Sequence, residues 1–452
     1  MLQFSSLEGR EMEAANHSKN SAMETENHVK HGTIPKSLIS KVNFSRTQRN
    51  SLTIKMLLLL LTVCFPHIFS AQNAYIAPEI KPYVEFIEKC NTSPVDYIME
   101  LFEKYDVVVL GERDHRDTTQ YALIQQIISD PRFIDKVGNV LTEVGVYNMR
   151  GELNSVLQAD YQNDSDFEKA LAEVVFNIQW LPLWEKTNYT QFLNDVYRVN
   201  KNLPTDKKLN VYPTDVQFSW EQNKNITADE FRLFLNTLEY RDLVMGNNAA
   251  DALLNIFSGS GKKALVIYNW WHSFRFHENT EAKHSGYQVI ADRFPGQVVN
   301  VALNWAILEK FNGIYTGLTN NGKWDAAFAA CGNKSIGFDL AGTIFGDDTF
   351  DLFDHAFADK HTYKDVYHGF IFYKPASEWI SASGVPIFRH LDESYVKNEL
   401  VRRLQVFQNN PNITEEFKEM LYDYAIGLSI VNIFEGESLE MIKNLIEMYH
   451  KP

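Results

Sequence analysis

The chain has 452 residues, of which 45% are hydrophobic and 22% are charged, a composition typical of a globular protein with a large core. Its formal net charge is −15. The body of the chain has no long Lys/Arg tract, and an acidic surface repels phosphates, so nucleic acid is excluded as an expected partner.

The N-terminal part of the chain predicts a leader rather than a part of the folded body. Residues 1–55 are polar and lack sustained apolar periodicity, which indicates a disordered or upstream extension. A lysine then precedes the apolar run Met56–Phe65, and the small residues Ser70 and Ala71 follow it. A basic flank, a short apolar core and small residues are typical of a secretory signal peptide, here at 56–71. The alternative is an uncleaved membrane anchor, but the run is short for a membrane span.

We therefore expect an exported protein, secreted or periplasmic, with no stable membrane span after the leader is removed. Two cysteines then remain, Cys90 and Cys331. An exported chain permits a disulfide between them, and the sequence leaves open whether they meet. The oligomeric state is equally open.

Six short apolar runs predict buried strands. They are rich in Val, Ile or Leu without strict alternation, a pattern that fits strands buried on both faces of a parallel sheet. The runs are Asp106–Leu110, Asn139–Thr142, Lys208–Tyr212, Lys263–Tyr268, Val298–Leu303 and Gly369–Tyr373.

Segments with helical spacing separate these runs, and one of them opens with a Thr-Ala-Asp-Glu capping box at Thr227. The alternation predicts an α/β fold, with a mostly parallel sheet flanked by helices. A helical subdomain is expected as an insertion near 145–207, and the tail from Asp392 to His450 is expected to be helical. No repeat or linker divides residues 75–452, so a single domain is expected. The helical segments between the runs are Thr118–Ser129, Asp166–Val175, Tyr189–Asn200, Thr227–Phe257 and Glu281–Phe294.

Polar side chains follow five of the predicted strands at the same end. In open α/β sheets, ligands bind outside the carboxyl ends of the strands, so we expect these side chains to converge on one site. In chain order they are Glu112 with His115, Glu143, Asp215, Asn269 with Trp271 and His272, and Asn304 with Trp305.

Glu112, His115 and Glu143 are the main candidates for chemistry. A carboxylate beside a histidine orients the imidazole and favours its protonated form, which suits acid–base catalysis. The structural alternative is an ion pair that holds a turn. Glu143 is costly at the end of an apolar strand unless it is paired or functional. Arg241 is its candidate partner, and a purely structural Glu–Arg pair is the alternative.

The segment around His272 carries weaker indications. Trp270 and Trp271 beside this histidine form either an apolar wall for a ligand or part of the core. His272, His277 and His284 do not have the spacing of a known metal-ligand set, so no metal is expected. The sequence also contains no phosphate loop, dinucleotide fingerprint or Gly-x-Ser-x-Gly elbow.

Five motifs in order resemble the erythromycin esterase-like family, over roughly residues 95–375. The first resembles that family's Gly-Glu-x-x-His opening, the second its strand that ends in Glu, and the third its helix-then-strand block. The fourth matches its Arg-Asp-x-x-Met helix, and the fifth resembles its strand that runs into a His-Asn-x-His motif. The motifs are Val107–His115, Leu141–Glu143, Phe192–Asn200 with Lys208–Gln217, Arg241–Met245 and Ala264–His272.

The resemblance implies a metal-independent, cofactor-free hydrolase that acts on a small-molecule ester or lactone; some members of the family open macrolide lactones. It implies that His115 activates water and that Glu112 and Glu143 orient it, with His272 as a further catalytic residue. The residues expected to bind substrate are Arg241, Asn269, Tyr268, Trp271 and Asp215.

The chain departs from the family pattern at two places. Arg116 stands where the family has Gly, and Tyr268 stands where it has the first His of His-Asn-x-His, with one extra residue before His272. The related ChaN-like haem-binding lipoproteins share the opening motif and the Arg-Asp-x-x-Met helix. The alternative is therefore a non-catalytic protein that binds haem or another large apolar ligand through Trp270, Trp271, Tyr268 and the histidines.

Overall fold

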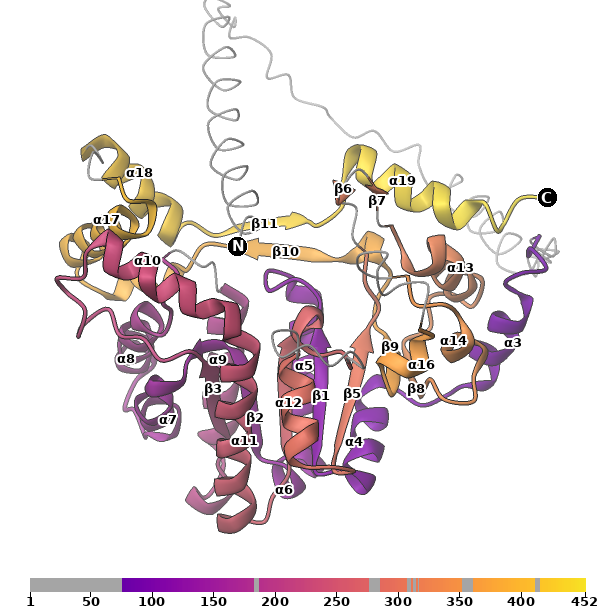
Figure 1. Ribbon diagram of the computed structural model, residues 1–452, viewed down its shortest axis with the longest axis horizontal. Helices are drawn as coiled ribbons and strands as arrows, with labels where there is room; N and C mark the ends of the chain where they lie inside the picture. Colours follow the sequence, from indigo (N-terminus) through magenta and orange to yellow (C-terminus); the bar gives the residue numbers. More distant parts are fainter. Residues whose placement is uncertain are drawn as a thin grey trace, which may run out of the picture. The chain divides into compact units, whose positions relative to one another are not determined.

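The apolar runs form the strands of one central seven-stranded sheet (Figure 1). In this computed structural model the strand order is β3-β2-β4-β1-β5-β9-β8. Neighbouring strands are parallel except β8 and β9, which pair antiparallel. The α/β class and the mostly parallel sheet are thereby confirmed. The strands are β1 (Val107–Glu112), β2 (Asn139–Val146), β3 (Asn210–Asp215), β4 (Ala264–Asn269), β5 (Val298–Leu303), β8 (Ile336–Asp339) and β9 (Gly369–Phe372).

The structure describes residues 75–182, 187–275, 285–306, 310–311, 314–315, 317–351, 361–410 and 415–452. The predicted extension 1–55, the predicted signal peptide 56–71, His277 and His284 lie outside the described residues. Tyr75–Pro452 form one compact unit. Within the described part, no helix is long and apolar enough to cross a membrane, and Cys90 and Cys331 are both free.

Both faces of the sheet are buried, which explains why its strands lack alternation. Val108 and Leu110 pack on one face with helices α4 (Pro94–Lys104) and α5 (Thr118–Ser129). Val107 and Val109 pack on the other with α11 (Arg241–Gly259) and α12 (Gly286–Arg293), drawn in front of the strands in Figure 1.

The segment 145–207 is helical, as predicted. Its helices α7 (Arg150–Gln158), α8 (Asp164–Asn177) and α9 (Thr187–Asn200) join the same core cluster as Val108 and Leu110. Short 3-10 turns at Tyr147–Met149 and Thr205–Lys207 flank them.

One predicted helix is in fact two. The capping box at Thr227 is present and starts α10 (Ala228–Thr237), but a 3-10 turn at Leu238–Tyr240 interrupts the helix before α11 begins. Arg241 is therefore the first residue of α11 rather than a position inside a longer helix. This break lets the side chains at the start of α11 face the carboxyl ends of the strands.

The tail contains the expected helices and one strand that the sequence did not indicate. The helices are α17 (Glu393–Gln408), α18 (Glu415–Ile426) and α19 (Gly436–Glu447). Between the last two, β11 (Ser429–Asn432) pairs antiparallel with β10 (Ile380–Ser383). The remaining elements are α3 (Lys81–Lys89), α6 (Pro131–Lys136), β6 (Lys310–Phe311), β7 (Ile314–Tyr315), α13 (Lys323–Ala330), α14 (Ile344–Asp347), α16 (Tyr363–Val366) and several 3-10 turns.

Candidate active site

Charged side chains from five elements meet at the carboxyl edge of the sheet. The end of β1 and the turn after it supply Glu112 and His115, and β2 supplies Glu143. The sequence places the end of β2 at Thr142, but the strand continues past Glu143 to Val146, with a register shift against β3. The other contributors are Asp215 at the end of β3, Arg241 and Asp242 at the start of α11, and His272 in the 3-10 turn after β4.

Gly111, the residue before Glu112, has a packing reason to be glycine. A Cβ at this position would lie 2.8 Å from Oγ of Ser273 and 3.2 Å from the carbonyl oxygen of Val301. The close approach of neighbouring strand ends therefore explains the glycine of the opening motif.

His115 lies between two buried carboxylates. Its Nδ1 is 3.1 Å from Oε2 of Glu112, and its Nε2 is 3.5 Å from Oε1 of Glu143. The carboxylates are 1% and 2% exposed, whereas the imidazole is 17% exposed and so reachable from solvent. Burial by itself lowers the pKa of His115, but Glu112 and Glu143 outweigh it and raise this pKa to about 9.

Glu143 is the centre of the cluster. Its Oε1 accepts from the Arg241 guanidinium at 3.2 Å and lies 3.3 Å from Nε2 of His272, and its Oε2 accepts from the backbone N–H of Asn269 at 2.8 Å. Burial by itself raises the pKa of Glu143, but the charged rings of His272 and His115 hold it well below its usual range. Glu143 is therefore an ionised acceptor that organises the cations around it.

Arg241 joins Glu143 to Asp215. Its Nε and Nη2 donate to the two carboxylate oxygens of Asp215 at 2.8 and 3.0 Å, a two-bond geometry that fixes the guanidinium plane. Trp180 donates from Nε1 to the same carboxylate at 2.9 Å. Burial by itself lowers the pKa of Arg241, but Asp215 and Glu143 outweigh it and raise this pKa above its usual value, so the side chain stays charged.

His272 is held between Asp242 and Glu143. Its Nδ1 is 2.6 Å from Oδ1 of Asp242, which also accepts from the backbone N–H of Gly286 at 3.3 Å. Burial by itself lowers the pKa of His272, but Asp242 and Glu143 raise it to about 10. Asp242 was assigned no role from the sequence, because an Arg-Asp pair on a helix most often lies on a solvated face.

Two residues of α5 were also missed. Gln120 donates from Nε2 to Oε1 of Glu112 at 3.3 Å, and the hydroxyl of Tyr121 donates to the same carboxylate. Burial and Glu112 together raise the pKa of Tyr121 well above its usual range, so it remains a proton donor. Their position in the chain could have indicated this role. Helix α5 begins directly after the turn that contains His115, so its first turn lies close to Glu112.

Three predicted substrate-binding residues are placed differently from expectation. Tyr268 is 0% exposed, with its hydroxyl 3.0 Å from Oγ1 of Thr214 and donating to the Met245 carbonyl, so this side chain lies in the core. Asn269 reaches Glu143 only through its backbone N–H, because its side chain donates to the Arg113 carbonyl. Trp271 is 46% exposed, and its ring contacts the rings of Trp270 and Phe274 edge-on.

The cluster therefore places four carboxylates beside three cationic groups, Arg241 and the two imidazolium rings. Loss of a proton from either ring would leave a further uncompensated buried negative charge. Among the described residues, no group of three or more His, Cys, Asp or Glu side chains is arranged to hold a metal ion. The catalytic roles of Glu112, His115, Glu143 and His272 stay predictions.

No protein-family model and no curated protein matches the sequence. Several solved structures are similar to this chain at low identity. A Bacillus cereus protein is 10% identical, covering 65% of this chain and 97% of that one, with a TM-score of 0.42. A mutant of erythromycin esterase EreC in its open conformation is 10% identical, covering 66% and 96%, with a TM-score of 0.38. ChaN of Campylobacter jejuni, described with cofacial haem binding, is 16% identical, covering 54% and 94%, with a TM-score of 0.30. At TM-scores of 0.42 or lower, these likenesses carry no argument about activity or ligand.

Proposed function

We propose that the chain is an exported, metal-independent hydrolase of a small-molecule ester or lactone, in which His115 activates the attacking water. The observation that carries the proposal is the partly exposed imidazole of His115 held between two buried carboxylates. A histidine oriented on one side by a carboxylate is a common arrangement for a general base. Export to a secreted or periplasmic location is proposed from the sequence of residues 56–71 alone.

In the proposed reaction, neutral His115 keeps the Nδ1–H bond to Glu112 and accepts a proton from water at Nε2. The hydroxide equivalent attacks the carbonyl carbon, and the carbonyl oxygen becomes negatively charged. Arg241 and protonated His272, both within 3.3 Å of Glu143, supply positive charge beside this oxyanion. Collapse breaks the bond to the alkoxy oxygen, which takes the proton back from His115 and leaves as the alcohol.

The protonation state of His115 makes this mechanism dependent on pH. With a pKa of about 9, only about 1% of the imidazole is neutral at pH 7. The active form therefore grows as pH rises, and kcat/KM should increase up to about pH 9.

The cluster fits the haem-binding alternative poorly. A histidine that ligates iron needs a ring nitrogen with an available lone pair. Both nitrogens of His115 and both of His272 face carboxylates, and these carboxylates favour the protonated rings. Tyr268, the third ligand considered, is buried in the core. A general base needs such a lone pair too, so the protonated rings do not separate the two functions; the burial of Tyr268, which removes one candidate haem ligand, favours the hydrolase.

The direct test is turnover of a panel of esters and lactones by the purified full chain, alongside His115→Gln and the control His390→Gln. His390 is a partly exposed histidine in the 3-10 turn Pro386–His390, and its Nε2 lies 3.4 Å from Glu168. We expect turnover to fall at least about 100-fold in His115→Gln, in line with the usual contribution of a general base, and to persist in the control. A folded protein that turns over no member of the panel would contradict the proposal. So would a His115→Gln variant with unchanged rates.

A further inference from the structure

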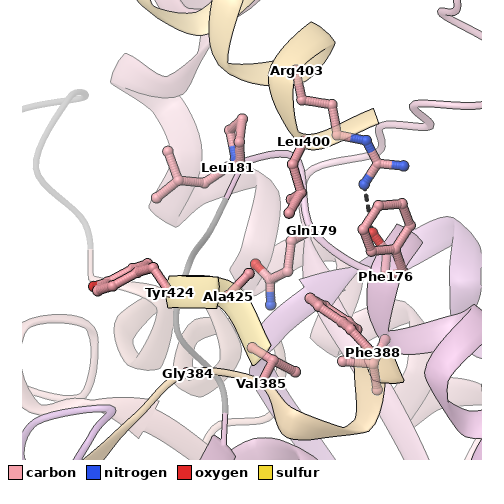
Figure 2. Close-up of a pocket in the computed structure, with 12 residues that line it drawn as sticks. Phe176, Gln179, Leu181, Gly384, Val385, Phe388, Leu400, Arg403, Tyr424 and Ala425 are labelled. Atoms are coloured by element: carbon pink, nitrogen blue, oxygen red, sulfur yellow. Dashed lines mark hydrogen bonds between the residues drawn. The ribbon is translucent and has the colours of Figure 1, made fainter. Parts of the chain in front are cut away.

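A second feature of the fold is an apolar pocket between α8, α17 and α18 (Figure 2). Its walls include Phe176, Leu181, Val385, Phe388, Leu400 and Ala425. It differs from the charged cluster in its lining. The segment Gln179–Leu181 lies between the pocket and the charged cluster. Trp180 donates to Asp215 in the cluster, whereas Gln179 and Leu181 line the pocket.

Two polar side chains of the lining have atoms without a hydrogen-bond partner among the described residues, Gln179 at both amide atoms and Arg403 at Nε. Gln179 is 8% exposed, and among the residues that the structure describes neither its Nε2 nor its Oε1 has a hydrogen-bond partner. Figure 2 shows its amide group pointing among Ala425, Val385 and Phe388. A buried amide without partners is unfavourable, and such groups are few in native proteins. Gln179 therefore presents one acceptor and two donor positions to whatever occupies the pocket.

The wall opposite Gln179 is held in a defined shape. The backbone N–H of Val385 donates to the carbonyl of Ala425 at 2.6 Å, which ties the loop after β10 to the end of α18. Gly384 has a φ of +85°, and a Cβ there would lie 1.5 Å from the carbonyl oxygen of Gly427. The two segments approach so closely that only glycine fits, so the pocket does not depend on flexible side chains alone.

The charged residue in the lining, Arg403, is bonded through its two terminal nitrogens, whereas its Nε has no hydrogen-bond partner among the described residues. It is 3% exposed and donates to the Phe176 carbonyl at 2.5 Å and to Oδ1 of Asn177 at 2.7 Å. Its Nε lies 3.5 Å from a carboxylate oxygen of Glu399. A cationic ligand would find no carboxylate in the lining, and an anionic ligand would meet only the Nε of Arg403, whose charge is already paired with Glu399. Burial of a charge without a partner is costly. The pocket favours a neutral ligand.

The size of the pocket limits the ligand further. Its cavity volume is about 40 Å³, which is room for about three waters or a compact molecule of a few non-hydrogen atoms. We propose that this pocket binds a small neutral molecule that carries one primary carboxamide on a short apolar body. Its amide would pair with Gln179 through two hydrogen bonds, one in each direction, and its apolar part would contact Val385 and Phe388. This site is independent of the proposed hydrolysis.

The test measures binding of isobutyramide to the full chain by titration, following the side-chain amide resonances of Gln179 in ¹H–¹⁵N spectra. The ketone 3-methylbutan-2-one has nearly the same shape and a carbonyl acceptor but no donor. We expect saturable binding of the amide that shifts the Gln179 resonances, and at least tenfold weaker binding of the ketone.

Two variants and one control separate the pocket from nonspecific binding. Gln179→Leu should weaken isobutyramide at least tenfold and raise the thermal midpoint, because it removes the buried unpartnered amide. Ala425→Leu should block binding by filling the pocket. Gln222→Leu, at an exposed position, should bind isobutyramide like the unaltered chain. Absence of saturable binding would overturn the proposal, as would equal affinity for the ketone or unchanged affinity in Gln179→Leu.

Discussion

Replacement of Glu112 by Gln should lower the pKa of His115 by at least about 1 pH unit. The substitution keeps the size of the side chain and an oxygen that accepts from Nδ1, but it removes the charge 3.1 Å from the ring. The rise of this pKa from 6.5 to about 9 corresponds to about 3 kcal/mol in favour of the imidazolium. Glu143 lies at the comparable distance of 3.5 Å, so each carboxylate supplies a large share of that energy.

The assay is an NMR titration of the His115 imidazole, assigned with His115→Gln. In the unaltered chain the midpoint should lie near pH 9, and in Glu112→Gln we expect it near 7 to 8, because about half of the carboxylate contribution is lost while burial still disfavours the charged ring. Glu437→Gln, an exposed carboxylate on α19, should leave the midpoint unchanged. A midpoint that stays near 9 in Glu112→Gln would refute the reasoning that this ion pair sets the protonation state.

Two further predictions concern stability. Because its folded pKa is raised, His115 should contribute stability that is fully present below about pH 6.5 and lost as pH rises through about 9. Urea titrations of the unaltered chain and of His115→Gln measure this contribution as the difference between their unfolding free energies. That difference should change by up to about 3 kcal/mol between pH 6 and 10, and a constant difference would contradict the prediction. Gly246→Ala should destabilise the folded chain by roughly 1–3 kcal/mol in thermal unfolding, because the new Cβ would lie 2.5 Å from Cβ of Val289 across the α11–α12 contact. Gly259→Ala in the same helix is the control, because its Cβ would have nothing within 4 Å. In the same measurement it should be neutral or stabilising.

The sequence predicted the main strands because a strand buried on both faces must be a continuous apolar run. Five of the described strands escaped this reasoning, and each of them has four residues or fewer: β6, β7, β8, β10 and β11. β8 has only four residues at the edge of the sheet, and all four residues of β11 are exposed, so neither carries a long apolar run. The helix break before Arg241 was also missed, because the residues of a 3-10 turn have the same composition as the helix they interrupt.

The convergence of the candidate site could be predicted from chain order alone. Parallel strands end at one edge, so polar residues placed after several apolar runs are brought together whatever the details of packing. This reasoning correctly placed Glu112, His115, Glu143, Asp215 and His272 near one another. It could not place Tyr268, because alternate residues of a strand point to opposite faces of the sheet. The last residue of β4, at the carboxyl edge, is its neighbour Asn269.

By itself, the sequence determined the class of fold and which chemical groups gather at the carboxyl edge, since both follow from the pattern of apolar runs and what comes after each. Only the tertiary structure decided how those groups pair. The contact of Asp242 with His272 joins the start of a helix to a turn 30 residues later in the chain. The pKa values of both histidines depend on such distances, because electrostatic energy varies with the separation and burial of charges from different elements. The pocket around Gln179 likewise exists only because α8 packs near α17 and α18, which lie far from α8 in the chain.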